Sequence, residues 1–268
     1  MPTPAPPKPV VKWAGGKQAL VPQLLAHFPE QFERYLEPFL GGASVALAVN
    51  APRAVLSDAN PWLIDTYRAI RDACEEVAAT LEALPNTKDD FLRIRALPQE
   101  ELSLVQRAAH FVYLNKTCFR GLFRVNRQGR FNVPYGDYQR RYFDPDNLRA
   151  VSRFLVHAEL SCLDYADAVS GACSGDFVYL DPPYYKLGGT ADFNRYTSGQ
   201  FREADHERLA ALCRELDARG VRWALSNSDT DFVRELFDGY TLHPIQARRE
   251  INLNARARNV RELLITNE

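Results

Sequence analysis

The apolar stretch 177–180 leads directly into Asp181, Pro182, Pro183 and Tyr184. Each proline fixes its own φ and biases the preceding residue towards an extended backbone, so this tetrapeptide has little conformational freedom. In an open α/β sheet, binding sites form at the carboxyl ends of strands. The Asp181 carboxylate and the Pro182 carbonyl could accept both hydrogens of an amine on a flat heterocycle while the Tyr184 ring stacks on it. The alternative is a proline-stiffened strand end with no chemistry.

Two glycines follow another predicted strand. Residues 35–39 form an extended apolar pattern that ends before Gly41 and Gly42, and an apolar helix start comes next. A strand, a glycine turn and a helix make the first half of a nucleotide-binding βαβ unit. A further strand, 54–58, ends in Asp58 about 20 residues after this turn begins, which is where an acid contacts ribose hydroxyls. A tight turn without a ligand is a common alternative, but Asp58 favours nucleotide binding.

Another glycine pair, Gly15 and Gly16, lies between Trp13 and Lys17. Glycines let backbone amides approach a ligand closely, and the lysine could meet a carboxylate or a phosphate. Alone, this short pattern indicates only a tight turn with the capacity to bind a ligand.

The segment 116–141 is basic and aromatic, although the whole chain has a net charge of -1. Its basic residues are Lys116, Arg120, Arg124, Arg127, Arg130, Arg140 and Arg141, opposed only by Asp137. Two alternating runs on either side of Gly129 predict a hairpin. The residues expected to face the protein are Phe123, Val125, Phe131 and Val133, which leaves Arg124 and the turn arginines free. A solvated charged surface is the usual explanation of such a run, but the interleaved aromatic residues favour a nucleic acid, because a two-stranded ribbon fits the major groove of DNA.

Length and composition suit one large α/β domain or a domain that carries an insertion. The chain has 268 residues, of which 46% are hydrophobic and 25% charged. No apolar run approaches the ~20 residues that span a bilayer, and the first residues lack the apolar centre of a signal peptide, so we expect a cytoplasmic protein that binds no membrane. The cysteines are Cys74, Cys118, Cys162, Cys173 and Cys213. Their wide spacing, without histidine partners, predicts reduced thiols and no metal site.

Helical periodicity and turn residues give the remaining elements. After Asn60, apolar residues keep a three-to-four spacing from Leu63 to Leu84, which predicts one long helix. The other predicted helices are 101–115, one that Asp205 caps and Gly220 ends, and 232–237. The other predicted strands are 154–160, 221–225 and 262–266. The polar and aromatic segment between Tyr185 and Phe201 is long enough for a mobile cover.

A glycine turn, an acid suited to ribose and a tetrapeptide that holds an amine together require a nucleoside cofactor and a heterocyclic amine acceptor. Methyl transfer from S-adenosylmethionine fits both. The chain closely resembles the Dam-type DNA adenine-N6 methyltransferases, class D12 with the alpha order of motifs. The matching parts are 12–17, 37–42, Asp58, 126–136 and 181–184. In that family, too, the cofactor motif precedes a recognition insert and the catalytic motif follows it.

The resemblance implies an α/β fold: a Rossmann-like S-adenosylmethionine-dependent methyltransferase sheet with an inserted DNA-recognition domain of helices and a β-hairpin. The methyltransferase domain would comprise residues 8–60 and 154–268, and the insert residues 61–153, after a disordered lead-in of residues 1–7. Such an enzyme methylates the N6 amine of an adenine flipped out of double-stranded DNA and needs no metal. Base-contacting positions match those of GATC-specific members. We expect a monomer on DNA, in the cytoplasm near the nucleoid or in a phage-infected host.

The family's functional positions map onto this sequence residue by residue. The catalytic residues would be Asp181, Pro182, Pro183 and Tyr184. Cofactor contacts would come from Trp13, Lys17, Glu37, Pro38, Phe39, Gly41, Asp58, Asp164, Tyr165 and Asp181. DNA contacts would come from Lys12, Phe119, Arg120, Leu122, Arg124, Asn126, Arg127, Arg130, Pro134 and Tyr138, with Phe119 as an aromatic wedge. Ala43 and Arg120 depart from the pattern, since many relatives have glycine at the first position and asparagine at the second.

Other functions remain open at this point. A methyltransferase could act on a cytosine amine, an RNA adenine or a protein glutamine, although aspartate before Pro-Pro-Tyr and the basic hairpin favour adenine in DNA. The chain could also be a DNA-binding regulator with a vestigial cofactor site. An NAD oxidoreductase fits poorly, because the glycine turn is not Gly-x-Gly-x-x-Gly and no hydride-transfer acid or base is evident.

Overall fold

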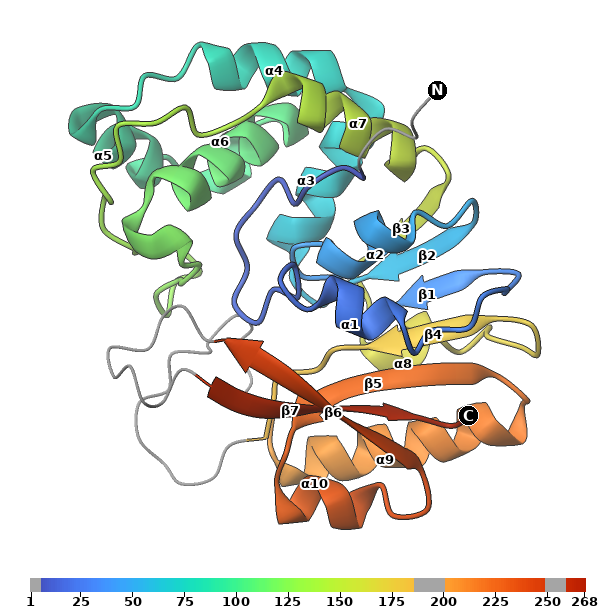
Figure 1. Ribbon diagram of the computed structural model, residues 1–268. Coiled ribbons are helices and arrows are strands. Elements are labelled where there is room, and N and C mark those ends of the chain that lie inside the picture. Colours follow the sequence, from blue (N-terminus) through green and yellow to red (C-terminus); the bar gives the residue numbers. More distant parts are fainter. Residues whose placement is uncertain (1–5, 186–200, 249–258) are drawn as a thin grey trace.

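A seven-stranded mixed β-sheet lies at the centre of the computed structural model, which describes residues 6–185, 201–248 and 259–268 (Figure 1). The strands are β1 (Tyr35–Glu37), β2 (Ala54–Ser57), β3 (Ala158–Ser161), β4 (Phe177–Leu180), β5 (Arg222–Ser228), β6 (Thr241–Arg248) and β7 (Asn259–Thr266). Their order in the sheet is β3-β2-β1-β4-β5-β7-β6. Strands β1 to β5 are parallel, whereas β7 runs antiparallel to β5 and β6. The order reverses direction between β1 and β4, and an open α/β sheet binds its ligands beyond the carboxyl ends of such strands.

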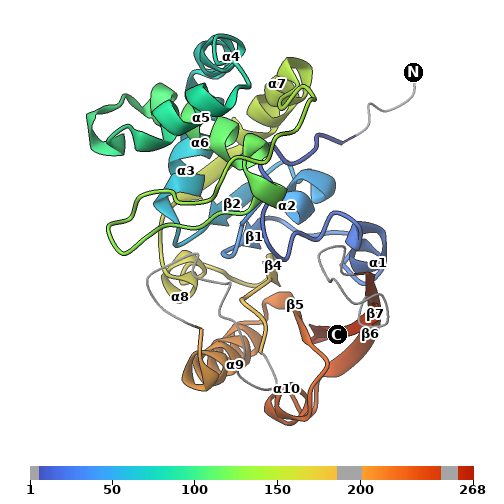
Figure 2. The same cartoon turned by 90° about the vertical axis from the view of Figure 1, so that its left-hand side faces the viewer.

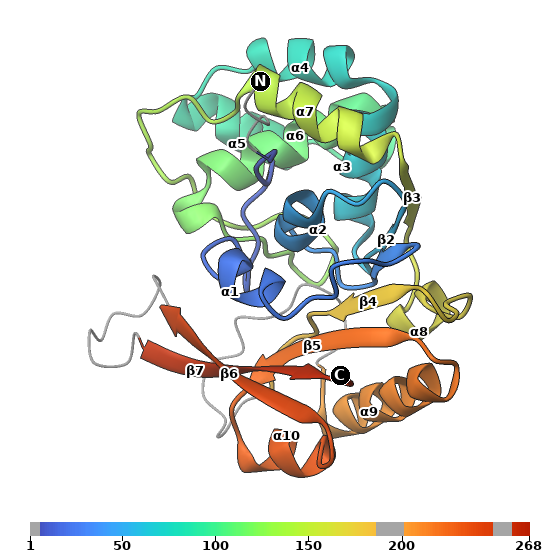
Figure 3. The same cartoon turned by 45° about the vertical axis from the view of Figure 1, so that its right-hand side comes forward.

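Helices cover both faces of the sheet, as the α/β class requires. They are α1 (Val21–Leu25), α2 (Ser44–Val49), α3 (Pro61–Asp72), α4 (Cys74–Glu82), α5 (Lys88–Ala96), α6 (Leu104–Thr117), α7 (Pro145–Leu155), α8 (Tyr165–Ala168), α9 (Glu203–Ala218) and α10 (Asp231–Leu236). Two short 3-10 helices are η1 (Gln99–Glu101) and η2 (Phe119–Gly121). Figure 3 shows α9 and α10 on one side of the sheet and α3 to α7 gathered on the other. The predicted Rossmann-like α/β class is confirmed.

Strand β4 is buried on both of its faces. Phe177 and Tyr179 belong to the hydrophobic cluster that includes α3 and α6, whereas Val178 and Leu180 belong to the cluster that includes α9. All four residues are at most 1% exposed. A parallel strand buried on both faces needs a continuous apolar run, which is why this stretch carries no charge before Asp181.

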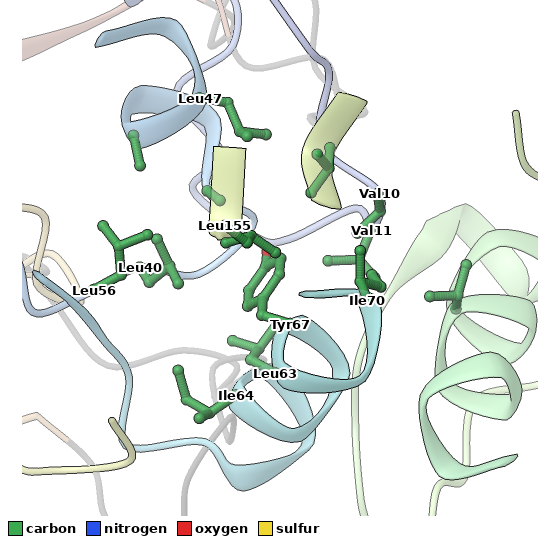
Figure 4. Packing of buried hydrophobic residues seen from close by; sticks show 14 of the residues in the cluster. Val10, Val11, Leu40, Leu47, Leu56, Leu63, Ile64, Tyr67, Ile70 and Leu155 are labelled. Carbon is green, nitrogen blue, oxygen red and sulfur yellow. The ribbon is translucent and has the colours of Figure 1, made fainter. Parts of the chain in front are cut away.

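One hydrophobic cluster joins the sheet to the helices between β2 and β3. Figure 4 shows Leu56 of β2, Leu63 and Tyr67 of α3, and Leu155 of α7 in this cluster. The Tyr67 hydroxyl also donates a hydrogen bond to the Gly41 carbonyl oxygen at 2.9 Å. The predicted boundary between 60 and 61 thus falls within a shared core, and the boundary between 153 and 154 falls inside α7. The division into two domains stays a prediction.

The long helix predicted from Leu63 to Leu84 is wrong, because two helices occupy this stretch. Ala73, with non-helical φ and ψ of -144° and 45°, separates α3, which ends at Asp72, from α4, which begins at Cys74. Both helices pack against α6, so apolar residues keep a helical spacing on either side of the break. Periodicity alone therefore does not distinguish one helix from two.

The predicted strand 154–160 is wrong in its first half. Asp144 accepts hydrogen bonds from backbone N–H groups of the first turn of α7 and Pro145 follows, so a helix begins there and runs to Leu155. Strand β3 begins only at Ala158. Phe154 and Leu155 belong to the buried face of α7, which explains their apolar character.

The carboxyl-terminal part matches the prediction more closely. Helix α9 begins at Glu203 rather than after Asp205, whose side chain accepts a hydrogen bond from the Arg202 backbone N–H at 2.7 Å. The helix ends shortly before Gly220, which has a φ of 68°. Strands β5 and β7 confirm two predicted strands, whereas nothing in the prediction corresponds to β6. The predicted mobile cover, 186–200, and residues 1–5 of the predicted lead-in lie outside the described residues.

The predicted hairpin is present, but its arms are not regular strands. An isolated antiparallel bridge pairs Val125 with Phe131. At the turn, the Asn126 N–H donates a hydrogen bond to the Arg130 carbonyl oxygen at 2.9 Å. The buried residues of the hairpin are Phe123, Phe131 and Val133, and Val125 is half-buried. Arg124 and the turn arginines are exposed, as the alternation predicts.

Candidate functional site

Asp181 directly follows β4, beside the point at which the strand order reverses, and forms an ion pair with Lys17. The Lys17 Nζ lies 2.7 Å from Asp181 Oδ1 and donates a hydrogen bond to Oδ2 at 2.8 Å. The same ammonium donates to the Gly15 carbonyl oxygen at 2.6 Å. The side chains of Lys17 and Asp181 are 5% and 16% exposed. Residues from two separate sequence motifs thus meet in one buried pair.

Burial raises the pKa of the Asp181 carboxyl, and the charge and hydrogen bond of Lys17 oppose this rise. The negative charge of Glu262 raises the pKa further. Asp181 Oδ1 accepts no well-aligned hydrogen bond from the residues that the structure describes, although it is buried. A buried acceptor of this kind suits a hydrogen-bond donor on a substrate.

Tyr184 lies against the same lysine. The Lys17 Nζ is 4.8 Å from the centre of the Tyr184 ring. The Tyr184 hydroxyl donates a hydrogen bond to Glu262 Oε2 at 2.9 Å. Pro182 is buried and Pro183 is exposed. The structure therefore gathers Asp181, Tyr184 and Lys17 at the end of β4.

Glu262 belongs to this group of residues, although no recognised motif contains it. It comes from β7 and is 9% exposed. In the sequence, it is a lone acid that immediately precedes the apolar run 263–265. That position is the one signal that could have indicated a role, because a buried carboxylate needs a polar partner.

Asp58 ties the end of β2 to the glycine turn. Its Oδ2 accepts a hydrogen bond from the Gly41 N–H at 2.9 Å, and its Oδ1 accepts one from the Asn60 N–H at 2.8 Å. Burial raises the pKa of Asp58 to about 6. The Trp13 ring packs so closely on the turn that a Cβ at Gly41 would lie 2.7 Å from Trp13 Cδ1. These contacts explain why glycine occupies position 41 and bring together three predicted cofactor residues.

Glu37 is enclosed beneath the glycine turn. Its carboxylate accepts hydrogen bonds from the Tyr35 hydroxyl at 2.7 Å and from the Ala46 backbone N–H. It is 2% exposed, and burial raises its pKa to about 8. The neighbouring Pro38 is also buried. Both residues therefore support the turn and α2, and direct contact of either with a cofactor stays a prediction.

Three aromatic rings gather just beyond β1, at the start of α8 and just before α9. Phe39 stacks on Tyr165 with ring centres 5.1 Å apart, and Phe201 lies 6.2 Å from Phe39 and 6.1 Å from Tyr165. Asp164 caps α8 and forms an ion pair with Arg208. Neither Phe201 nor Arg208 was predicted to belong to the site. Three neighbouring rings suit a purine, because aromatic faces stack on flat heterocycles.

Several predicted DNA-binding residues meet around η2. Asn115 fixes the backbone of Lys12 through hydrogen bonds of 2.7 and 2.9 Å. The Lys12 side chain lies against Gly121, where a Cβ would come within 2.3 Å of Lys12 Cδ. The Tyr138 hydroxyl accepts a hydrogen bond from the Arg120 N–H at 2.9 Å. The amino-terminal segment, the end of α6 and Tyr138 thus form one surface.

Phe119 and Lys116 give this surface an aromatic and cationic character. Phe119 is 44% exposed, and the Arg120 guanidinium carbon lies 5.1 Å from its ring centre. Lys116, which the sequence placed in the basic stretch but not among the DNA contacts, is half-buried. Burial and the charges of Lys12 and Arg140 lower its pKa to about 8. Clustered cations beside an exposed ring suit a nucleic acid.

The hairpin carries the remaining predicted DNA contacts. Arg124 donates from Nε to Asn132 Oδ1 at 2.7 Å and from Nη2 to the Asn132 carbonyl oxygen at 3.1 Å. Asn126 Oδ1 accepts hydrogen bonds from the backbone N–H groups of Gln128 and Arg130, so this side chain builds the turn. The other predicted contacts on the hairpin are the exposed Arg127, Arg130 and Pro134 and the half-buried Leu122. The Arg124 guanidinium is therefore already oriented in the absence of DNA. The side-chain oxygen of Asn126 already accepts its hydrogen bonds within the turn.

The two departures from the family pattern share a backbone conformation. Ala43 has a φ of 60° and Arg120 a φ of 59°. Glycine adopts this left-handed conformation freely, and asparagine adopts it more readily than most residues. The glycine and asparagine that are usual at these positions therefore fit the backbone better than the alanine and arginine found here.

Trp13 connects the glycine turn with the predicted DNA-binding hairpin. Besides packing on the glycine turn, its ring lies 5.2 Å from that of Phe123 in the hairpin. Figure 2 shows the segment between α6 and α7 on the same side of the molecule as the carboxyl end of β4. The two groups of residues thus lie towards one side of the protein.

The described residues contain no helix that is long and apolar enough to cross a membrane. Within the same residues, no group of three or more His, Cys, Asp or Glu side chains could hold a metal ion. The five cysteines are free thiols.

The mixed seven-stranded sheet, with Asp181 and Tyr184 directly after β4, defines a Rossmann-like α/β methyltransferase. The family model of the D12 class N6 adenine-specific DNA methyltransferases matches residues 13–251. The chain belongs to this family and is an adenine-specific DNA methyltransferase. This confirms the resemblance recognised in the sequence.

Relatives of known function agree with this family. The type II methyltransferase M.MjaIII of Methanocaldococcus jannaschii is 35% identical, in a match that covers 97% of this chain and 99% of the relative. The DNA adenine methylase of Serratia marcescens is 36% identical over 95% of this chain and 96% of its own. The DNA adenine methylase of Vibrio cholerae is also 36% identical, over 95% of this chain and 94% of its own. These matches extend over nearly the whole length of each protein and are not confined to motifs.

Family membership decides between the alternatives that the sequence left open. The family acts on N6 of adenine in DNA, which decides against cytosine amines, RNA and protein glutamine. A methyltransferase family also decides against an NAD oxidoreductase and against a regulator without enzymatic activity.

Proposed function

We propose that this enzyme transfers a methyl group from S-adenosylmethionine to N6 of an adenine flipped out of double-stranded DNA, within the sequence GATC. The observation that carries the proposal is the buried Asp181 carboxylate after β4, which Lys17 pairs and Tyr184 flanks. A charged acceptor beside an aromatic ring suits the exocyclic amine of a flat base. The enzyme would act as a monomer on cytoplasmic DNA, of the nucleoid or of a phage.

The residues around the glycine turn suit S-adenosylmethionine. Phe39, Tyr165 and Phe201 offer ring contacts for its adenine, and Asp164 lies beside Tyr165 to accept from the adenine amine. Asp58 would accept from the ribose hydroxyls on lone pairs that its two backbone hydrogen bonds leave free. When bound there, the cofactor supplies an electrophilic methyl group on a positively charged sulfur.

Asp181 and Pro182 would activate the adenine amine, which is a poor nucleophile because its lone pair is delocalised into the ring. Hydrogen bonds from N6 to Asp181 Oδ1 and to the Pro182 carbonyl oxygen push electron density towards N6. As N6 forms its bond to the methyl carbon, the carbon–sulfur bond breaks and N6 loses one proton, for which Asp181 is the acceptor. The remaining acceleration comes from alignment and charge placement.

Lys17 and Tyr184 would prepare the site for the base. The charge and hydrogen bond of the Lys17 ammonium lower the pKa of Asp181 against the rise that burial causes, which favours a charged acceptor for the amine. Tyr184 would stack on the flipped base, a contact worth about 1–3 kcal/mol. Unstacking and unpairing the base costs a few kcal/mol, which this contact partly offsets.

The surface around η2 and the hairpin would recognise the target sequence. Arg124 would bond both acceptors of a guanine, and Leu122 would contact a thymine methyl group. The other base contacts would come from Lys12, Pro134 and Tyr138. Phe119 would enter the base stack as a wedge with Arg120 beside it, and Asn126, Arg127 and Arg130 near the turn would contact phosphates.

The test uses a plasmid without adenine methylation, incubated with the purified protein and S-adenosylmethionine that carries a tritiated methyl group. We expect tritium in the DNA, resistance to a nuclease that GATC methylation blocks, and cutting by a nuclease that requires this methylation. Asp181→Asn is the matched inactive variant, because it replaces the carboxylate by an amide of the same shape. Its methyl-transfer rate should fall by about 100-fold or more.

Each outcome bears on a separate part of the proposal. Incorporation of tritium without protection of GATC would contradict the sequence assignment and leave the cofactor assignment standing. Absence of tritium from the DNA under conditions in which the fold is intact would contradict the cofactor assignment. Near wild-type incorporation by Asp181→Asn would contradict the role of that carboxylate. A 2:1 protein-to-duplex complex in sedimentation would contradict the monomer.

A further inference from the structure

We infer that Glu262 is a positioning residue that fixes the orientation of the Tyr184 ring for the target base. The inference rests on the proposed stacking role of Tyr184. Its direct support is the hydrogen bond from the half-buried Tyr184 hydroxyl to Oε2 of the buried Glu262, at 2.9 Å.

The backbone at Glu262 is held from both sides. In the sheet, Glu262 is the register partner of Ser228 on β5 and of Ile245 on β6. A residue with neighbours in both directions of the ladder has little freedom to move. Its carboxylate is therefore a fixed point from which a nearby side chain can be oriented.

Tyr184 needs such a fixed point, because the rotation of its side chain is its main remaining freedom. The prolines at 182 and 183 restrict the backbone that leads to it. The Lys17 ammonium lies over one face of the ring, with its Nζ 4.8 Å from the ring centre. The hydrogen bond to Glu262 anchors the far end of the ring, so that both its tilt and its depth are set before a base arrives.

The hydroxyl is suited to act as the donor in this contact. Burial, together with the negative charges of Asp181 and Glu262, raises the pKa of Tyr184 well above its ordinary value. The phenol therefore keeps its proton at physiological pH. A hydrogen bond to an ionised acceptor is roughly twice as strong as a neutral one.

A purely structural role does not account for an acid at this place in β7. Burial of a carboxylate is costly, and an apolar residue would pack more favourably beside Leu264, which lies on the same face of β7. Within the described residues, Glu262 forms no ion pair with a lysine or arginine. Its hydrogen bond points into the catalytic group, which is where an oriented ring has an effect.

The experiment compares Glu262→Ala, Glu262→Gln, Tyr184→Phe and the double variant Tyr184→Phe/Glu262→Ala in single-turnover methylation of a duplex oligonucleotide. Glu262→Ala should lower the rate of methyl transfer by about 10-fold, and Glu262→Gln, which keeps an oxygen acceptor, should restore most of it. Tyr184→Phe should lower the rate as Glu262→Ala does. The double variant should be no slower than the slower single variant, because both changes remove the same contact.

The pH profile gives a second readout that a loss of packing would not change. The charge of Glu262 raises the pKa of Asp181, so Glu262→Gln should move the acid limb of kcat/KM to lower pH. Thr266→Ala is the control on the same strand, because Thr266 is also buried, at 5% exposed. Its hydroxyl forms hydrogen bonds with the His243 ring and the Glu268 carbonyl oxygen, and with no described residue of the site. Thr266→Ala should leave rate and profile unchanged, and thermal unfolding reports whether each variant folds.

Two results would overturn the inference: a wild-type rate for folded Glu262→Ala, or rate losses of Tyr184→Phe and Glu262→Ala that multiply in the double variant. If Glu262→Ala does not fold, Glu262→Gln and Tyr184→Phe still test the inference. A reduced rate of methyl transfer in Glu262→Gln beside a wild-type rate in Tyr184→Phe would show that Glu262 does not act through the Tyr184 ring. Tyr184→Ala separates this inference from the proposed function. A normal rate for Tyr184→Ala would remove the stacking role itself, whereas a reduced rate beside a normal Glu262→Ala would remove only the role of Glu262.

Discussion

The central contact of the site joins two residues that lie far apart in the sequence, Lys17 and Asp181. A carboxyl group buried at this depth without a cation would favour its neutral form, and a neutral carboxyl is a weaker acceptor for an amine. Lys17 therefore lowers the pKa of the acceptor in addition to binding it. The loss of Lys17 differs in kind from the loss of a contact with the substrate.

The first prediction concerns pH. Asp181 must be ionised to accept hydrogens, so kcat/KM should fall as pH decreases through its pKa, and burial should set this acid limb above the ordinary aspartate value of about 3.9. Because Lys17 lowers the pKa of Asp181, Lys17→Met should move the limb to higher pH. Lys8→Met, at an exposed residue of the same segment, should not. An unchanged limb, or a shift to lower pH, in Lys17→Met would contradict this assignment.

The second prediction separates recognition of sequence from attraction to DNA. Arg124, which Asn132 holds at the hairpin edge, should contribute about 1–3 kcal/mol of discrimination at one guanine, so Arg124→Ala should relax specificity at that base pair. Arg127→Ala, at an exposed residue of the turn, should weaken binding to all sequences alike and lower the salt slope by about 1. Competition binding with single-base substitutions of the site at several salt concentrations measures both. Equal effects of the two substitutions on specificity would refute the distinction.

The motif residues of the site could be predicted from the sequence, but their partners could not. The prolines between Asp181 and Tyr184 mark these two residues in the sequence, and the glycines before Lys17 mark the lysine. Glu262 and Phe201 reach the site only through the pairing of β7 and the packing of α9, which no local pattern encodes. The hydrogen bonds that commit Asn126 to its turn likewise depend on the backbone of residues around it.

At the scale of elements, the glycine turn before α2 carries strain. Ala43 enters the helix in a left-handed conformation and is 1% exposed. Such a conformation costs an L-residue about 1–2 kcal/mol. The surrounding contacts, including the hydrogen bond of Tyr67 to the Gly41 carbonyl oxygen, hold the turn in place in spite of this cost.

The third prediction follows from this strain. Ala43→Gly relieves it, and this offsets most of the stability that glycine ordinarily loses relative to alanine. The control is Ala46→Gly, at a residue that is also fully buried but helical within α2. The loss in free energy of unfolding should be smaller for Ala43→Gly than for Ala46→Gly by about 1–2 kcal/mol, as measured by urea denaturation. Equal losses would indicate that position 43 is unstrained.

The elements themselves could be predicted to different degrees. Strands such as β4 could be predicted because burial on both faces demands an apolar run. The break between α3 and α4 could not, since Ala73 is neither glycine nor proline and gives no local signal. The start of α7 did have a signal, Asp144 followed by Pro145, but the apolar run 154–156 resembles a strand as well as the end of a helix.

At the scale of the whole molecule, the helices between β2 and β3 share a hydrophobic cluster with the sheet. Leu63 and Tyr67 of α3 share a cluster with Leu56 of the sheet. The amino-terminal segment adds to this connection, because the backbone of Lys8 exchanges hydrogen bonds of 2.8 and 2.9 Å with Asn147 of α7. The predicted DNA-binding hairpin thus packs on the same hydrophobic cluster as β4, which leads to Asp181.

The fourth prediction tests whether residues 61–153 can fold without the sheet. The isolated fragment 61–153 should not unfold cooperatively, because it would expose the face of α3 that the sheet buries. The full chain should show one urea transition by circular dichroism and by tryptophan fluorescence. A sigmoidal transition of the fragment, or two separated transitions of the full chain, would favour independent domains with the boundaries expected from the sequence.

The indole of Trp13 touches both the glycine turn at Gly41 and the hairpin at Phe123. A ligand that shifted this ring at the Gly41 end would change the packing at the Phe123 end, so its binding and the proposed binding of DNA would be thermodynamically linked. Such linkage would be reciprocal: the factor by which a small ligand beside Gly41 changed the affinity for DNA would equal the factor by which DNA changed the affinity for that ligand.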